Sequence, residues 1–239
     1  MTPKTTRPVL LFDLWRTLAW SATPEPVWDL QRILGHRDGR PDDAFLRRCL
    51  TLDVDDPAAF LGRLAQEFDR PVTRAVLAAF EEVLDAEARS TRVFDDVEPV
   101  LDALREQGYR LGVVSNAWPF SVPHVFGAHD LARHFEHRVF SYETGSRKPE
   151  PAMFLEASRR FGVTADACLM VGDNVDADVR GSVRLGMRAA LIDRTARDDD
   201  PGLATIPGAF RLRTLRELPR RLGTSVGEAA CAARSGAGG

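Results

Sequence analysis

Cysteine is scarce in this chain, and no pattern for secretion or membrane insertion is present. The 239 residues include three cysteines, Cys49, Cys168 and Cys231, which lie far apart in the sequence. This odd, scattered set does not match a disulfide framework or a zinc site, and it favours a reducing compartment. No apolar run approaches the roughly 20 residues that cross a bilayer, and residues 1–8 lack a secretory pattern. We therefore expect a cytoplasmic protein with no membrane partner.

Lysine is almost absent, and there is no excess of positive charge. The net charge is −3, whereas nucleic-acid-binding proteins usually carry a basic excess, so no nucleic-acid partner is expected. Only Lys4 and Lys148 are lysines among the 32 basic residues. Against this arginine-rich background, Lys148 in the chain interior is a candidate functional residue. The remaining composition, 44% hydrophobic and 28% charged, is typical of a folded globular protein.

Short apolar runs alternate with helical patterns along most of the chain. The expected strands are residues 9–12, 111–114, 139–140, 168–171, 189–192 and 210–212. Runs of this kind suit strands that are buried on both faces of a parallel sheet. The helical patterns between them are residues 96–107, 151–161 and 175–185. This alternation predicts an α/β fold with a doubly wound parallel sheet.

A stretch of about 70 residues after the first expected strand breaks the alternation. Residues 24–92 look all-helical, and the expected helices are residues 27–34, 43–50, 57–68 and 73–88. Asp56-Pro57 is a good helix start and Gly35 a good stop. We interpret the stretch as a helical cap domain over the sheet edge. The expected domains are a core of residues 1–20 and 93–225, a cap of residues 21–92 and a disordered tail of residues 226–239.

Four of the apolar segments lead into polar, reactive residues. These are Asp13 with Thr17, Ser115 with Asn116, Lys148 after a short loop, and Asp173 with Asp178. Ligands bind beyond the carboxyl ends of the strands in an open α/β sheet. We therefore expect these four groups to meet in one pocket that binds a small-molecule substrate.

Each group in this set suits displacement at phosphorus. Asp13 can attack as a carboxylate nucleophile and form an acyl-phosphate. Asp13 and Asp173 can together hold Mg²⁺ through hard oxygen ligands. Ser115 can donate to a phosphoryl oxygen, and Lys148 supplies a compact positive charge for the nucleophile and the transferred group.

Four ordered segments resemble the motifs of the haloacid dehalogenase (HAD) superfamily. They read LLFDLWRTL, VVSN, SRKPEPAMF and VGDNVDADVRGSVRLGM, and the resemblance covers residues 9–193. A helical insert between the first and second motifs is similar to that of the subfamily with its cap in this place. The resemblance implies a Rossmann-like core and a hydrolase, usually one that cleaves phosphate esters with Mg²⁺.

The resemblance also implies a role for each motif residue. Asp13 is the nucleophile, and Asp173 and the backbone carbonyl of Trp15 are metal ligands with it. Asp178 lies near the waters of the metal and near Lys148. The residues that orient the phosphate and the nucleophile are Thr17, Ser115 and Asn116.

One position departs from the family pattern. Family phosphatases usually carry a second aspartate two residues after the nucleophile, which protonates the leaving group and then activates water. Here this residue is Trp15, and the usual small residue after it is Arg16. An indole cannot exchange a proton at neutral pH, and general acid–base help is worth about 10²–10⁴-fold in rate. We therefore expect weak activity on esters with poor leaving groups.

Three functions remain open from the sequence. Family dehalogenases also lack the second aspartate, often have an aromatic residue there, and attack carbon without a metal. Their fourth motif usually loses the metal aspartate, whereas this chain keeps Asp173 and Asp178, which favours a metal site and phosphate chemistry. The third hypothesis is a non-catalytic ligand-binding protein on a HAD scaffold. Either a monomer or a homodimer is compatible with the sequence.

Several residues near the motifs have two interpretations. Trp15 is either a packing residue or a substrate platform, and Arg16 is either a surface or gate residue or a ligand for an anionic substrate. We place both provisionally in the substrate site. For Trp20, Trp28, Trp118 and Phe120, ordinary packing is the expected role rather than lining of the pocket.

Overall fold

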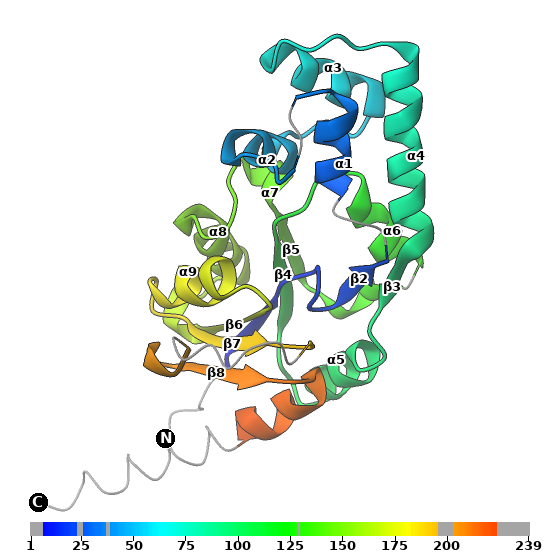
Figure 1. The fold of residues 1–239 in the computed structure, drawn as a ribbon. Coiled ribbons are helices and arrows are strands. Elements are labelled where there is room, and N and C mark those ends of the chain that lie inside the picture. The colour runs from blue at the N-terminus through cyan, green and yellow to red at the C-terminus, as the bar shows by residue number, and fades with distance from the viewer. Residues whose placement is uncertain (1–6, 23–25, 37–38, 129, 196–202, 224–239) are drawn as a thin grey trace, which may run out of the picture.

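Six parallel strands form the central sheet of the protein. The computed structural model describes residues 7–22, 26–36, 39–128, 130–195 and 203–223. The strand order is β5-β4-β1-β6-β7-β8, and every neighbouring pair is parallel (Figure 1). The strands are β1 (Val9–Phe12), β4 (Leu111–Ser115), β5 (His137–Phe140), β6 (Cys168–Gly172), β7 (Arg188–Ile192) and β8 (Ala209–Leu212). This confirms the doubly wound parallel sheet, and each strand lies within two residues of its predicted bounds.

The sheet is covered by helices on both faces, which explains why its strands are apolar throughout. All four residues of β1 are buried. Leu10 and Phe12 pack in one apolar cluster with α5 (Val97–Glu106), whereas Val9 and Leu11 pack in another with α8 (Pro151–Phe161). Successive side chains of a strand point to opposite faces, so one four-residue run contributes to both halves of the core. Figure 1 shows α5 and α8 on opposite sides of the sheet.

Four helices form an insert above the sheet, with an apolar core of their own. The helical insert consists of α1 (Pro26–Ile33), α2 (Asp43–Thr51), α3 (Pro57–Glu67) and α4 (Arg74–Ser90) (Figure 1). Three of the helices have N-caps in which a side chain accepts a backbone N–H, at Asp42, Asp56 and Thr73. Such caps satisfy amides that have no partner within the helix. The bounds of all four helices agree with the prediction within two residues.

The junction between the insert and the sheet differs from the prediction. Residues up to 92 were expected to be helical, but β2 (Ala19–Ser21) and β3 (Thr91–Val93) form a two-stranded antiparallel ribbon. The ribbon joins the two points at which the chain enters and leaves the insert. Its strands are only three residues long and about 70 residues apart in the sequence, so no local pattern reveals their pairing.

Other short elements also escaped prediction or differ from it. The expected helix of residues 175–185 is a π-helix, Val175–Arg180, that continues into α9 (Gly181–Val183). Two helices were not predicted, α6 (Ser121–Ala128) and α7 (Ser141–Thr144). The described residues also include four 3₁₀ turns, at Leu131–His134, Ala165–Ala167, Leu203–Thr205 and Leu215–Glu217, and a helical segment at residues 218–223. None of the described helices is both long enough and apolar enough to cross a bilayer. The predicted tail, residues 226–239, lies outside the described residues.

Candidate active site

The predicted site residues lie at the carboxyl edge of the sheet, where the parallel strands end. Asp13 directly follows β1, Ser115 is the last residue of β4, and Asp173 directly follows β6. Because β1 lies between β4 and β6 in the sheet, Asp13 is flanked by the other two strand ends. The topology therefore brings three of the four motifs together, as the strand-end rule predicts.

Lys148 completes the group from the loop before α8. Its Nζ donates hydrogen bonds of 2.6 Å to Oδ1 of Asp13 and 2.6 Å to Oδ1 of Asp178. All three residues are buried, and the lysine is only 3% exposed. A buried ammonium requires charged partners at this range, because an unpaired charge away from water is very costly. The lysine and the two carboxylates therefore form one electrostatic unit.

Gly172 leaves room for the Asp178 carboxyl. A Cβ at position 172 would lie 2.2 Å from Oδ2 of Asp178, so any side chain would displace the carboxyl. The other contact of this carboxyl is the backbone N–H of Asn174, at 3.0 Å from Oδ2. Asn174 in turn caps the π-helix, since its Oδ1 accepts from the N–H groups of Asp176 and Ala177. Gly172 and Asn174 thus position the Asp178 carboxyl that contacts Lys148.

Three carboxylates share this small region with one lysine. One oxygen from each of Asp13, Asp173 and Asp178 lies within 4.8 Å of the others. Burial raises the pKa of Asp13 to about 6, against the lowering effect of the Lys148 ammonium. Burial and the negative charges of Asp13 and Asp178 raise the pKa of Asp173 to about 7. The ionised forms of Asp13 and Asp173 are thus disfavoured by burial and by like charge, which a bound cation would offset.

The lysine is held in its charged form by the same neighbours. Burial alone lowers the pKa of Lys148, but the carboxylates of Asp13 and Asp178 raise it above its ordinary value. The ammonium is therefore present over the whole range of physiological pH. It supplies a fixed positive charge at the Asp13 carboxyl.

Two hydroxyl groups close to the site have unused hydrogen-bonding capacity. Oγ of Ser115 lies beside the Asp13 carboxyl. Like Oγ1 of Thr17, it is buried and has no hydrogen-bond partner of normal geometry among the described residues. The Thr17 backbone is fixed, since its carbonyl accepts from Arg194 at 2.7 Å. Buried polar groups are rarely left without partners, so Thr17 Oγ1 has capacity for a polar ligand, whereas the Ser115 hydroxyl interacts with the Asp13 carboxyl.

Asn116 holds the backbone of Lys148. Its Nδ2 donates to the Lys148 carbonyl at 2.9 Å, and its Oδ1 accepts from the Lys148 N–H at 2.7 Å. The side-chain amide of Asn116 therefore binds both the backbone N–H and the backbone C=O of Lys148, which is 32 residues away in the sequence. This contact fixes the segment that carries the lysine, and it was not foreseen from the sequence.

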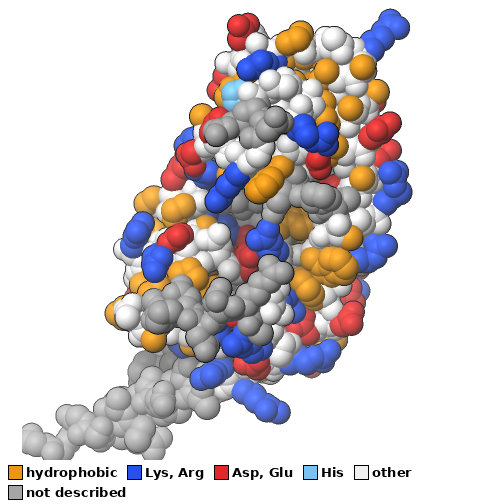
Figure 2. Space-filling model, in the orientation of Figure 1, with side chains coloured by type: hydrophobic (Ala, Val, Ile, Leu, Met, Phe, Trp, Pro, Cys, Tyr) orange, Lys and Arg blue, Asp and Glu red, His pale blue; other side chains and the backbone are white. Residues whose placement is uncertain are grey.

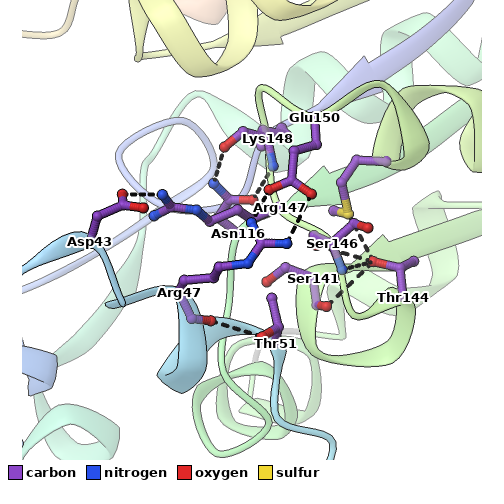
Figure 3. A network of polar contacts seen from close by, with 11 residues as sticks. Asp43, Arg47, Thr51, Asn116, Ser141, Thr144, Ser146, Arg147, Lys148 and Glu150 are labelled. Atoms are coloured by element: carbon purple, nitrogen blue, oxygen red, sulfur yellow. Dashed lines mark hydrogen bonds and ion pairs between the residues drawn. The ribbon is translucent and has the colours of Figure 1, made fainter. Parts of the chain in front are cut away.

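Two crossed ion pairs join the helical insert to the same segment. Arg47 on α2 pairs with Glu150, and Asp43 on α2 pairs with Arg147 (Figure 3). The core partners lie on either side of Lys148 in the sequence. The insert thus contacts the loop that carries Lys148, which we call the lysine loop, through two ion pairs. In one pair the insert supplies the positive charge, and in the other it supplies the negative charge. Partners about 100 residues apart carry no sequence signal for one another.

A cleft of about 700 Å³ lies between the helical insert and the carboxyl edge, and we call it the central cleft. In Figure 2, hydrophobic, basic and acidic side chains lie next to one another in the middle of the view, below the helical insert. The predicted site residues that line it are Asp13, Trp15, Arg16, Asn116, Lys148, Asp173 and Asp178. Thr17 and Ser115 are fully buried behind them. The sequence-based expectation of a single pocket therefore agrees with the geometry.

Trp15 and Arg16 form one wall of the central cleft. Trp15 is half-buried and faces the cleft. Arg16 has a left-handed backbone, with φ of +57°, and its exposed guanidinium lies 3.8 Å from the Asp173 carboxylate. Such a backbone is uncommon for a residue other than glycine. It turns the arginine toward the acidic group.

Trp20 and Trp28 also line the cleft, which corrects the expectation that they serve in ordinary packing. Both are substantially exposed, at 39% and 43%. Trp118 has both roles, because it is buried in the core of the insert and also borders the cleft. Phe120 packs against Trp118, as expected.

Comparisons with known proteins agree with this geometry. The family model of the haloacid dehalogenase-like hydrolases matches residues 11–186. The glyceraldehyde 3-phosphate phosphatase of Methanopyrus kandleri is 36% identical over an alignment of 142 residues, and the match covers 54% of this chain and 58% of that protein. The chain spans about half the length of the curated relatives it matches.

Solved structures show the same fold over nearly the whole chain. A HAD phosphatase from Thermococcus onnurineus is 27% identical with a TM-score of 0.61, and 90% of this chain and 98% of that one are covered. A 2-haloacid dehalogenase from Pseudomonas syringae pv. Tomato DC3000 is 24% identical with a TM-score of 0.62, over 92% and 99% of the two chains. The second likeness concerns the fold alone. Because the family match spans more than half of the sequence and ends within the Rossmann-like core described above, this chain belongs to the haloacid dehalogenase-like hydrolases.

Proposed function

We propose that the protein is a Mg²⁺-dependent phosphatase that cleaves a small phosphate ester through an aspartyl-phosphate on Asp13. One observation carries this proposal: Nζ of Lys148 lies 2.6 Å from both Asp13 and Asp178, while Asp173 lies with them in one acidic cluster. A nucleophilic carboxylate, a fixed cation and a further acidic pair are the parts that phosphoryl transfer requires.

The acidic cluster fits a divalent metal ion. Asp13 and Asp173 would hold Mg²⁺ together with the backbone carbonyl of Trp15, and Asp178 would lie close to its water ligands. The raised pKa values of Asp13 and Asp173 support this assignment, because a hard cation stabilises carboxylates that otherwise lack positive charge. When bound, the ion neutralises charge on the phosphoryl oxygens.

The side chains of the site bind and position the reacting groups in both halves of the reaction. A carboxylate oxygen of Asp13 attacks phosphorus, and the bond to the leaving-group oxygen breaks with its electron pair. Lys148 holds the carboxylate in place and balances negative charge on the transferred group. The hydroxyls of Ser115 and Thr17, which lie behind the cleft lining, orient the nucleophile and the phosphate. Water then cleaves the acyl-phosphate, releasing phosphate and restoring the Asp13 carboxylate.

The helices above the sheet have a separate task in this proposal. We assign residues 1–20 and 93–225 to the core domain and residues 21–92 to a cap domain. The contacts of α2 with the lysine loop and the shared lining of the central cleft support this division. The core supplies the chemistry, and the cap shapes the space for the substrate.

A dehalogenase is the second candidate function. The aromatic residue at position 15 favours it, and it requires no acid at that place. In this reaction Asp13 attacks carbon, halide leaves with its electron pair, and water cleaves the resulting ester. The acidic cluster around Asp173 has no task in such a mechanism, so the phosphatase is the better supported proposal.

A substrate screen separates the candidates. Phosphate release from p-nitrophenyl phosphate, glyceraldehyde 3-phosphate and phosphoserine is measured with Mg²⁺ and with EDTA, and halide release from 2-chloropropionate is measured in parallel. Asp13→Asn serves as the blank. Phosphate release that requires Mg²⁺ and Asp13 supports the proposal. Halide release in EDTA identifies a dehalogenase, and absence of both reactions in a folded protein points to a binding protein.

A further inference from the structure

The chain has four tryptophans, and all of them line the central cleft. They come from four separate places: Trp15 follows β1, Trp20 lies in β2, Trp28 lies in α1 and Trp118 follows β4. Their convergence is a property of the tertiary structure, because no two of them are neighbours in sequence. Indole rings offer large, flat apolar surfaces that stack on other rings.

Two of these indoles expose apolar surface that nothing in the described chain covers. Among the described residues, the exposed large hydrophobic side chains are Trp20, Trp28, Val72 and Leu155. Half of this set therefore borders a single cleft. Exposed apolar surface in a concave site is a common sign of ligand binding.

The other side of the cleft is rigid. Trp118 is fixed by a hydrogen bond from Nε1 to the buried Glu87 carboxylate, at 3.2 Å. Its ring also makes edge contacts with Phe60, Phe80 and Phe120 at centroid distances of 6.3, 5.9 and 5.6 Å. A ring held on several sides has little freedom to lose when a ligand binds. Because Trp118 is only 2% exposed, it forms a fixed border of the cleft, and the apolar surface that a flat group can cover comes from Trp15, Trp20 and Trp28.

The cleft also has few groups that could protonate a departing alcohol. Trp15 stands at the position of the usual acid. Among the described residues that line the cleft there is no histidine, tyrosine or cysteine. Of its acids, Asp13, Asp173 and Asp178 form the cluster assigned to the nucleophile and the metal, and Glu87 accepts a hydrogen bond from Trp118. A substrate that needs no proton from the enzyme is therefore the best match. Phenols have a pKa of about 10, well below that of an alkyl alcohol, so they depart as phenolate.

We propose that the substrate is a phosphate monoester of an aromatic alcohol, with the ring seated among the tryptophans of the central cleft. The proposal rests on the phosphatase function above. The bond between a carboxylate oxygen of Asp13 and phosphorus forms, the bond from phosphorus to the aryl oxygen breaks, and the electron pair stays on the phenolate, which takes its proton from water. The tryptophans of the cleft favour a substrate with a ring, and the missing acid favours a good leaving group. Aryl phosphates have both properties.

A panel of four esters tests the two properties separately. Phenyl phosphate has the ring and the good leaving group, benzyl phosphate has only the ring, a fluorinated alkyl phosphate with a phenol-like alcohol pKa has only the leaving group, and propyl phosphate has neither. We expect KM to be roughly ten-fold lower for the two ring compounds and kcat to be higher for the two good leaving groups. Equal KM values with and without a ring overturn the proposal.

Binding without turnover keeps this test independent of the phosphatase assignment. Phenylphosphonate and propylphosphonate cannot be cleaved, and all four tryptophans report on the cleft by fluorescence. We expect saturable quenching, with phenylphosphonate binding several-fold more tightly. If phenylphosphonate binds more tightly but no ester is hydrolysed, the phosphatase function fails while the ring site stands. If the two phosphonates bind alike, the ring site fails.

Two variants locate the ring. Trp28→Ala is expected to raise KM for phenyl phosphate about three- to ten-fold and to leave KM for propyl phosphate unchanged, whereas Trp28→Phe restores most of the affinity. Leu155→Ala is the matched control, because Leu155 is 50% exposed but lies on α8, away from the cleft lining. A Trp28→Ala variant that affects both esters equally contradicts the placement of the ring.

Discussion

The carboxyl edge of the sheet and the helical insert meet at one cleft but are built from different materials. The edge contributes buried charges, with Lys148 paired to both Asp13 and Asp178. The insert contributes aromatic and aliphatic surface, with Trp28, Leu46 and Leu50 facing the cleft. The comparison teaches that the charged lining and most of the aliphatic lining of the cleft come from separate parts of the chain, whereas its tryptophans come from both.

The largest expected effect comes from giving the edge the group it lacks. Trp15→Asp places a carboxyl two residues after the nucleophile, where it can protonate a leaving alcohol. We expect turnover of propyl phosphate to rise by about 10²-fold or more, with a smaller gain for phenyl phosphate. Steady-state kcat for both esters measures this. If the variant is folded and binds Mg²⁺ but stays inert on alkyl esters, the missing acid does not explain a preference for esters with good leaving groups.

The buried charges of the edge predict a large effect on stability. Lys148→Met leaves the carboxylates of Asp13 and Asp178 buried without their cation, and breaking such a pair costs about 3–5 kcal/mol. Urea unfolding at neutral pH measures the loss. Arg180→Met is the matched control, since Arg180 pairs with Asp176 at the surface and surface pairs contribute about 0–1 kcal/mol. Similar losses in the two variants would show that the edge is not the tightly coupled unit described above.

A second buried charge cluster, beside the ends of β7 and β8, predicts a pH-dependent effect. Asp96 is buried and accepts from Arg194, Thr214 and the Leu215 N–H. Burial raises the pKa of Asp96, but these donors lower it further, so the net shift is below its ordinary value. A carboxyl with a lowered folded-state pKa stabilises the fold above its unfolded-state pKa, near 3.9, and this contribution is lost as the pH falls through the folded-state pKa.

Comparison of the wild type with Asp96→Asn tests this sign. We expect the variant to lose about 1.5–3 kcal/mol of unfolding free energy at pH 5–7, and the difference to shrink below pH 4. Urea unfolding at several pH values measures it. A difference that grows toward acid would mean that the protonated form of Asp96 is the favoured one in the folded state.

The smallest effect is expected where the two regions touch. Arg47→Ala removes one of the two crossed ion pairs between α2 and the lysine loop. Its partners are partly exposed, so the loss of stability should stay below about 1 kcal/mol. KM should shift about two-fold in low salt and less in high salt, because exposed charges are screened. Arg48→Ala is the control, since Arg48 pairs with Glu67 within the insert. An equal shift in both variants would remove the special role of the contact.

The two regions also differ in what their sequence reveals. The positions of Asp13, Ser115 and Asp173 at strand ends were predicted correctly, because a buried parallel strand is a compact apolar run and these residues stand at its end. The helices of the insert were found from caps such as Asp56 and from their apolar period. The aromatic lining of the cleft was not found, because an exposed tryptophan on a helix has the same sequence signature as a packed one.

Contacts between distant segments account for the remaining gaps. The hold of Asn116 on the Lys148 backbone, the ion pairs of α2 and the pairing of β2 with β3 all join segments that no local pattern relates. The π-helix at Val175–Arg180 is another gap, because its sequence has the acidic start of an ordinary helix. Local physics thus predicts elements and strand ends, whereas the fit between elements requires coordinates.

The ribbon of β2 and β3 has an architectural consequence. Trp20 pairs with Arg92 and Ser21 with Thr91, and the hydroxyls of Ser21 and Ser90 lie 2.7 Å apart. The two segments that connect the sheet to the helical insert are thus paired in one ribbon. The insert therefore begins and ends at neighbouring points. Modules with adjacent ends are readily exchanged. Evolution can therefore replace the helical insert with helices of another size or shape, and so change which substrates enter the cleft, without altering the residues at the carboxyl edge of the sheet.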